Sequence, residues 1–394
     1  MAASALLNIG ANPFTPRSGQ EPKVFLGRER EIKTFLTQLH KARHKSFEHF
    51  VILGGWGVGK TTLLKGFRKA AQAQRVITSF VGIHEFTDNE LLPPVVHLLT
   101  QIPRTLPIKF DHLKRFSQYL QGMGISFPII GGGIEFAEKK KLDGDPQVLL
   151  LEGLTRLWRE LRKEMDVLVV FLDDVQNYAA VPEFLGVLKN VLSDDDVAGA
   201  TGYLFVLSAT EDGWSTFLQK NHPIGRYFIP ILSIQRLSKK DTLKIIDATL
   251  KGSRVEFTND VKEAVYEYSE GHPFQMQILC TYLFDSQLSG KVGLAQLDGA
   301  LAQTLYELGP ILLDPLYRLA SDQEKQILEA MSAQYRIYTF DDLLEHLKHD
   351  SSSVSKGALG PALSRLTEKG VLVKIDRGKY RIINRMFNEF LAHQ

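Results

Sequence analysis

The 394-residue chain has very little cysteine, since Cys280 is the only one and lies within an apolar run. A single thiol excludes an internal disulfide framework, and it also excludes a structural zinc site built from several cysteines. Residues 1–7 lack the basic stretch that opens a secretory signal peptide. Together these absences favour the reducing cytoplasm as the location of the protein.

Long hydrophobic runs and a strong charge of one sign are also missing. No run approaches the roughly 18 apolar residues that a membrane helix needs, so we expect no membrane partner. Lysine and arginine total 47 against 45 acidic residues, a formal net charge of +2. Any surface for nucleic acid must therefore come from local clustering of basic residues.

A glycine-rich segment is the most informative feature that is present. It fits the pattern G-x-x-x-x-G-K-[ST] without a mismatch and consists of Gly54, Gly55, Trp56, Gly57, Val58, Gly59, Lys60, Thr61 and Thr62. Residues 49–53 before it read as a short buried strand, and residues 62–70 after it read as an amphipathic helix. This context distinguishes a phosphate-binding loop from a glycine-rich turn that matches by chance.

The chemistry of this loop points to ATP and Mg²⁺. Glycines let backbone N–H groups close around phosphate oxygens, and the helix N-terminus adds a positive dipole. We expect Lys60 to reach the β- and γ-phosphates and the Thr61 hydroxyl to hold Mg²⁺.

Two carboxylates end the apolar strand predicted over residues 167–174. At this end of a parallel nucleotide-binding sheet, Asp173 would orient the Mg²⁺ shell. Asp174 would polarise a water for attack on the γ-phosphate. The alternative is a solvated strand end with acidic turn residues, which the nearby loop makes less attractive.

Three further positions have an ordinary explanation beside the functional one. Thr210, or Ser208, ends the strand predicted over 203–210 and either positions the attacking water or is a plain strand end. Arg226 either acts as an arginine finger, in its own or a neighbouring subunit, or forms a surface salt bridge. His272, before Pro273, either contacts the nucleotide or caps a helix.

The pattern of elements predicts an α/β protein with further helical parts. We expect an extended arm over 1–22 and a P-loop domain over 23–232, with a parallel sheet covered on both faces. Residues 76–83 and 227–232 are its other strands, and a hairpin insertion is expected near 124–137. A helical lid follows over 233–310, and a winged-helix domain over 311–394.

The winged-helix prediction comes from three helices followed by a β-hairpin. Residues 356–385 contain eight lysines and arginines against two acids. This favours contact with double-stranded DNA, and the alternative is a protein-binding winged helix with a solvated basic face. The candidate DNA contacts are Lys356, Arg365, Lys369, Lys374, Arg377 and Lys379.

Taken together, these motifs resemble the AAA+/STAND group of P-loop ATPases, closest in look to archaeal-type ATPases and origin-initiator-like proteins. The resemblance covers about residues 23–394 and implies an AAA+/ASCE-type sheet, a helical lid and a C-terminal winged helix. It implies that Gly27 and Arg28 lie near the adenine and that Asp174 supports hydrolysis. It also implies that His272 and Pro273 sense the nucleotide.

The chain departs from many AAA+ proteins in two places. It has Asp173-Asp174 where many have Asp-Glu, a pair that looks more like STAND proteins, and it has His272 where many lids carry an arginine. The weaker sensor favours slow hydrolysis, as in a molecular switch.

Three functions follow from these patterns. The first is an ATP-driven switch that forms homo-oligomers in ATP and acts on DNA. The second is a STAND-type signalling or defence ATPase that needs a separate partner protein and binds no DNA. A small-molecule kinase is the least favoured, because no acceptor pocket can be read from the sequence.

Overall fold

The computed structural model describes residues 11–17, 21–107, 110–125, 144–221, 223–286, 290–349 and 354–393. The chain divides into two compact units, each described here by itself. We call Arg28–Gln235 the sheet unit, and Met1–Gly27 together with Arg236–Gln394 the helical unit. The chain thus leaves the helical unit after Gly27 and returns to it at Arg236.

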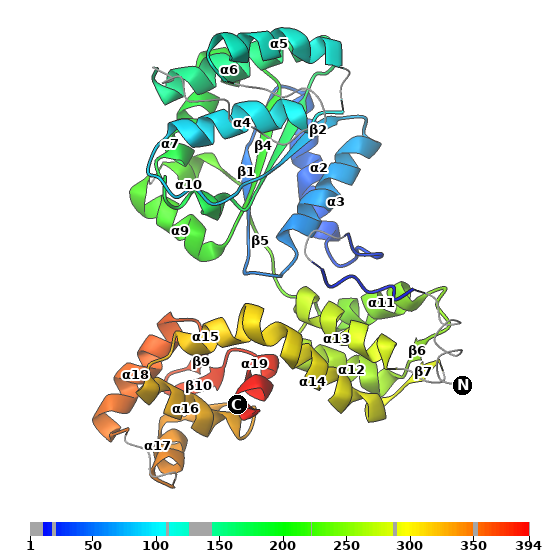
Figure 1. The fold of residues 1–394 in the computed structure, drawn as a ribbon, viewed down its shortest axis with the longest axis vertical. Coiled ribbons are helices and arrows are strands. Elements are labelled where there is room, and N and C mark those ends of the chain that lie inside the picture. Colours follow the sequence, from blue (N-terminus) through cyan, green and yellow to red (C-terminus); the bar gives the residue numbers. More distant parts are fainter. Residues whose placement is uncertain are drawn as a thin grey trace. The chain divides into compact units, whose positions relative to one another are not determined.

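The sheet unit is built on five parallel strands in the order β2-β3-β4-β1-β5 (Figure 1). Their bounds are β1 Phe50–Leu53, β2 Ile77–Gly82, β3 Leu168–Asp173, β4 Tyr203–Ala209 and β5 Ile231–Ser233. The helices are α2 Glu29–Arg43, α3 Lys60–Ala73, α4 Leu92–Arg104, α5 Phe110–Gly122, α6 Pro146–Leu161, α7 Phe184–Leu192, α8 Asp195–Ala198, α9 Glu211–Lys220 and α10 Ile224–Tyr227, with the 3₁₀ turn η1 Val175–Tyr178. The predicted parallel α/β sheet is confirmed.

Both faces of this sheet are covered, because successive strand residues point to opposite sides. Phe50, Ile52 and Phe171 face a core formed with α2 and α3. Val51, Leu53 and Leu172 face a larger core formed with α4, α6 and α7. Figure 1 shows these two helical layers on either side of the strands. Near-continuous apolar strands are what burial on both faces requires.

One predicted strand of the sheet unit is misplaced. Residues 227–232 were expected to form it, but Tyr227 ends α10 and the strand begins at Ile231. Phe228 is fully buried, with its ring 6.1 Å from that of Trp214. Pro230 has no N–H to donate, which disfavours an earlier start of the ladder. The hairpin expected over 124–137 lies outside the described residues, apart from Gly124 and Ile125.

The helical unit contains the other described helices. Their bounds are α11 Lys239–Leu250, α12 Asn259–Ser269, α13 Pro273–Asp285, α14 Leu297–Leu308, α15 Asp314–Arg318, α16 Asp322–Ser332, α17 Phe340–His349, α18 Lys356–Glu368 and α19 Arg385–Ala392, with the 3₁₀ turn η2 Leu294–Gln296 and the π-helical segment η3 Gly309–Leu313. The strands β6 Glu256–Phe257 and β7 Lys291–Val292 pair with each other. The strands β8 Tyr338–Thr339, β9 Leu372–Asp376 and β10 Lys379–Ile382 form a small antiparallel sheet.

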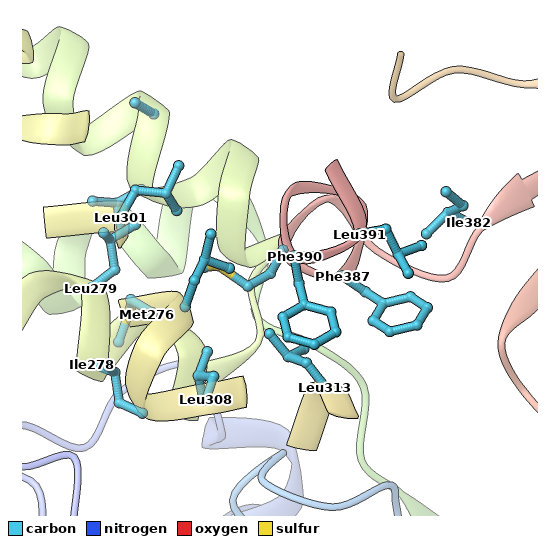
Figure 2. Packing of buried hydrophobic residues seen from close by; sticks show 14 of the residues in the cluster. Met276, Ile278, Leu279, Leu301, Leu308, Leu313, Ile382, Phe387, Phe390 and Leu391 are labelled. Atoms are coloured by element: carbon cyan, nitrogen blue, oxygen red, sulfur yellow. The ribbon is translucent and has the colours of Figure 1, made fainter. Parts of the chain in front are cut away.

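One hydrophobic core runs through the described part of the helical unit. It includes Leu279 of α13, Leu301 of α14 and Phe387 of α19. Figure 2 shows Leu308 and Leu313 in the same cluster; Leu308 directly precedes the π-helical segment, and Leu313 is its last residue. The predicted border at 310/311 therefore falls inside a continuous helical stretch rather than in a loop. The elements α16, α17, α18, β9 and β10 follow in the predicted order of three helices and a hairpin.

The described part of the N-terminal arm packs into the helical unit. Phe14 is 4% exposed and stacks on Phe257 with ring centroids 5.9 Å apart, while Phe284 meets it edge-on at 6.4 Å. Asn12 Nδ2 donates to the carbonyl of Thr281 at 3.1 Å. An aromatic ring buried in this way anchors the arm to a core whose other members lie more than 200 residues later.

Candidate nucleotide-binding and hydrolytic site

The glycine-rich loop joins β1 to α3, as the sequence predicted. Gly57 and Gly59 have φ of +72° and +98°, in the left-handed region that favours glycine. A Cβ at Gly54 would lie 2.8 Å from Val58 Cγ2, so a larger residue would distort the loop. A Cβ at Gly59 would meet nothing within 4 Å. The loop therefore leaves open space at the N-terminus of a 14-residue helix, where an anion is favoured.

Lys60 is the first residue of α3 and is 6% exposed. Its Nζ donates to the carbonyls of Gly54 and Gly55 at 2.9 and 3.0 Å. Burial lowers the pKa of this ammonium group, and three nearby carboxylates oppose the shift: those of Asp174, Asp173 and Glu211. The cation is thus held against the loop backbone and faces the acidic strand end.

Asp173 ends β3 and is 5% exposed. Its Oδ1 accepts a hydrogen bond of 2.5 Å from Ser208 Oγ, and Thr61 also hydrogen-bonds its side chain. Burial raises the pKa of Asp173, and the hydrogen bonds from Ser208 and Thr61 oppose that shift. A hydroxyl beside a carboxylate is the oxygen donor set that Mg²⁺ prefers, so Thr61 and Asp173 fit as its ligands.

Asp174 follows in a backbone conformation that is uncommon for a residue other than glycine. Its φ is +61° and its ψ is +49°, in the left-handed region that aspartate tolerates better than most residues. Its N–H donates to Ser208 Oγ at 2.9 Å. Ser208 therefore bridges the two aspartates, which favours it over Thr210 as the hydroxyl of this strand that touches the acidic pair.

Gln176 was not singled out in the sequence. Its Nε2 donates to Asp174 Oδ1 at 2.9 Å, and its Oε1 accepts the N–H of Thr210 at 3.2 Å. The Thr210 hydroxyl caps α9 by accepting from the N–H of Gly213 at 3.1 Å. The strand order explains why these residues meet, because β4 lies between β1 and β3.

The comparison with known families agrees with this geometry. Residues 24–198 match the family described as AAA ATPase domain, a range that contains the glycine loop and both aspartates. The chain contains an AAA ATPase domain. The predicted AAA+ resemblance is thereby confirmed.

Solved structures of similar length show the same fold. The Walker-type ATPase of Pyrococcus abyssi is 16% identical, with 95% of this chain and 98% of that chain covered and a TM-score of 0.59. The Aeropyrum pernix ORC2 protein, solved as ADPNP–ADP complexes, is 15% identical, with 96% of each chain covered and a TM-score of 0.63. An uncharacterized HTH-type transcriptional regulator of Methanocaldococcus jannaschii is 20% identical over 392 residues, or 94% of this chain and 89% of the relative.

Arg28 binds the backbone of the glycine loop of the AAA ATPase domain. It is 7% exposed, and its Nη2 donates to the carbonyl of Val58 at 3.2 Å. Its Nη1 lies 3.6 Å from Glu31. Gly27 belongs to the helical unit, has φ of +76° and packs against Leu237. Its predicted role near the adenine stays a prediction.

Three other predicted residues, Arg226, His272 and Pro273, do not join the site within the sheet unit. Arg226 lies exposed on α10, and no ion pair with another described residue is seen for it. His272 and Pro273 belong to the helical unit, where His272 is 7% exposed and its Nδ1 caps α13 by accepting from the N–H of Gln275 at 3.5 Å. Gly271 has φ of +72°, and a Cβ there would lie 2.0 Å from the carbonyl oxygen of Leu237.

The predicted DNA contacts fall into two groups. Arg365 Nε and Lys369 Nζ bind the two carboxylate oxygens of buried Glu324 at 2.7 and 2.6 Å. Lys379 lies 3.8 Å from Asp376 on the hairpin. The remaining three side chains are exposed and form no ion pair seen within the described ranges: Lys356, Lys374 and Arg377.

Two more basic residues of this region make contacts inside the helical unit. Arg381 of β10 lies 3.4 Å from Glu270, and Arg385 lies 3.0 Å from Glu267. Glu267 lies in the last turn of α12, and Glu270 is the residue that directly follows this helix. Part of the positive charge counted in the sequence is therefore balanced within the unit. None of the described helices is both long and apolar enough to cross a membrane.

Proposed function

We propose that the chain is an ATP-dependent molecular switch that hydrolyses ATP slowly and forms homo-oligomers in ATP. We further propose that it contacts double-stranded DNA through a C-terminal winged helix. The observation that carries the proposal is the meeting of Lys60, Thr61, Asp173 and Asp174 at one end of the sheet. The fold shared with the ORC2 protein solved with ADPNP and ADP supports nucleotide binding.

The proposed reaction uses this chain's own residues as follows. Backbone N–H groups of the loop and the Lys60 ammonium bind the β- and γ-phosphates. Thr61 and Asp173 hold Mg²⁺, which supplies charge neutralisation on the phosphate oxygens when it is bound. Asp174 accepts a hydrogen bond from the attacking water and orients it toward the γ-phosphate. Slow turnover is proposed because His272 stands where many AAA+ lids carry an arginine.

Several predicted residues remain part of the proposal. Gly27, Arg28 and Trp56 are proposed to lie against the nucleotide, as are His272 and Pro273. Trp56 is half exposed, which leaves its ring accessible to a ligand. Exposed Arg226 is proposed to reach the γ-phosphate of a neighbouring subunit, and the Thr210 hydroxyl to position the attacking water.

The decisive experiment uses Asp174→Asn, with exposed Asp88→Asn as its matched control. We expect the Asp174 variant to bind ATP but to hydrolyse it about 100-fold more slowly or worse, because a general base contributes on that order. Size-exclusion chromatography with light scattering, in ADP, in ATP and in ATP with duplex DNA, should then show the assembled state accumulating. Normal hydrolysis by Asp174→Asn would show that the assignment is wrong.

The DNA part of the proposal rests on the β9–β10 hairpin. Lys374 and Arg377 are exposed there and form no ion pair with a described residue. We expect Lys374→Ala with Arg377→Ala to weaken duplex binding and to reduce the salt slope by about one unit per lost phosphate contact. Exposed Lys163→Ala in the sheet unit is the matched control. A flat titration of the wild type in ATP at low salt contradicts DNA binding.

One observation favours the second function, a STAND-type ATPase without DNA binding. Arg365, Lys369, Arg381 and Arg385 all pair with glutamates inside the helical unit. A winged helix whose basic residues are used in this way is suited to protein contacts. In that case the protein stays a monomer locked with bound ADP, and binding of a separate partner protein releases it from this locked state. This reading is supported if light scattering finds a monomer in ADP and also finds no assembly in ATP with duplex DNA.

A further inference from the structure

Gln176 makes two hydrogen bonds that connect the acidic strand end to the next strand. It lies in η1, two residues after Asp174, and is half-buried. Its Nε2 donates to Asp174 Oδ1 at 2.9 Å, and its Oε1 accepts from the N–H of Thr210 at 3.2 Å. Both ends of one amide are thus used on the two strand ends that border the proposed reaction site.

The orientation of this amide follows from its partners. The Thr210 N–H can only donate, so it requires the carbonyl oxygen of Gln176. An ionised carboxylate can only accept, so Asp174 requires the NH₂ group. Reversing the amide would break both hydrogen bonds at once, and the observed orientation is therefore the one the surroundings select.

The backbone around Gln176 is held as firmly as its side chain. Asp174 adopts a left-handed conformation, with its N–H fixed by Ser208. Gly213, in the first turn of α9, packs so closely that an added Cβ would lie 2.4 Å from Gln176 Cβ. A larger residue at position 213 would therefore force Gln176 or its surroundings to shift.

We propose that Gln176 is a positioning residue for ATP hydrolysis. By binding one oxygen of Asp174, it fixes the carboxylate and leaves the second oxygen to accept a hydrogen bond from the attacking water. Because its other end is bound to the backbone at the end of β4, a shift of that strand end would also move the carboxylate. The inference deepens the proposed function and rests on the role assigned there to Asp174.

The test compares two substitutions of similar size. Gln176→Glu keeps an acceptor for the Thr210 N–H but cannot donate to Asp174, and Gln176→Met loses both hydrogen bonds. We expect each to lower the single-turnover rate of ATP hydrolysis about tenfold to hundredfold, as a small misplacement of a reacting group does. The dissociation constant for ATP should stay within about twofold, because the loop and Lys60 are untouched.

The outcomes are distinguishable. A normal rate for Gln176→Glu beside a slow Gln176→Met would overturn the proposal, because the amide would then serve only as an acceptor for Thr210. Normal rates for both would also overturn it. Asp174→Asn, run in parallel, separates this failure from failure of the proposed function. If Asp174→Asn is inactive while both Gln176 variants are normal, only the inference about Gln176 is wrong.

Gly213→Ala tests the positioning role of Gln176 with a residue that forms no hydrogen bond to it. Alanine is a better helix former than glycine, so its helix propensity partly offsets the crowding that the added methyl group causes. We expect the variant to hydrolyse ATP about tenfold more slowly or worse, with ATP affinity retained. For the Gln176 variants, the control is Gln72→Ala, which replaces an exposed and unrelated glutamine on α3. A folded Gly213→Ala protein with a wild-type rate would contradict the proposal.

Discussion

Replacing Glu324 with glutamine should destabilise the helical unit and release two basic side chains. Glu324 is fully buried at the start of α16 and accepts from Arg365, Lys369 and the N–H of Ser321. Burial opposes ionisation of this carboxyl, but the hydrogen bonds from Lys369, Ser321 and Arg365 outweigh it and lower its pKa to about 2. The substitution Glu324→Gln keeps the shape of the side chain and removes its charge.

The magnitude follows from the displaced pKa. The ordinary value is 4.5, and each unit of displacement corresponds to about 1.4 kcal/mol. Arg365 and Lys369 are 49% and 32% exposed, so solvent screening reduces the effect. We therefore expect Glu324→Gln to cost about 1–3 kcal/mol at pH 7. Because the folded pKa is depressed, this stability is present above about pH 4.5 and is lost as the pH falls toward 2.

The assay can separate the two units. All three tryptophans lie between residues 56 and 214, in the sheet unit. Tryptophan fluorescence therefore follows the sheet unit, and far-ultraviolet circular dichroism follows the helices of both. We expect Glu324→Gln to move the circular-dichroism transition and to leave the fluorescence transition unchanged. Equal stability of variant and wild type at pH 7 would refute the reasoning, and so would a difference that persists at pH 2.

Three further predictions concern other parts of the molecule. Phe14→Ala should destabilise the helical unit by about 3–5 kcal/mol, measured by circular dichroism, because it removes a buried ring. Lys60→Met should weaken ATP binding at least about tenfold in a titration calorimeter, because the ammonium bound by the loop is lost. Burial lowers the pKa of His49 and of His97 to about 4, so the stability of the sheet unit, followed by tryptophan fluorescence, should fall between pH 6.5 and 4. A flat profile there contradicts the burial of these rings.

Local sequence patterns were sufficient to predict the strand ends that form the candidate nucleotide site. The glycine loop and the apolar strand before Asp173 each lie within a few adjacent residues. Both are found where their spacing places them. The sheet order then brings the loop and the aspartates together, because the ends of parallel strands lie at one edge.

The contacts that were missed join residues far apart in the chain. Gln176 contacts Thr210 from 34 positions away, and Glu324 binds Arg365 and Lys369 from 41 and 45 positions away. No periodicity or motif relates such positions, so Arg365 and Lys369 were read as members of an exposed basic cluster. A charge count along the sequence cannot tell a solvated lysine from one that a buried carboxylate already neutralises.

The arm described at the start of the chain has a consequence for biosynthesis. Asn12 and Thr281 are 269 positions apart, and ribosomes add about 5–20 residues per second. Phe14 therefore emerges roughly ten to fifty seconds before the helices that cover it have been made. The sheet unit is complete at Gln235 and can fold during this interval. Phe14 therefore stays without the core that buries it until the later helices have been made, and its burial follows synthesis of the sheet unit.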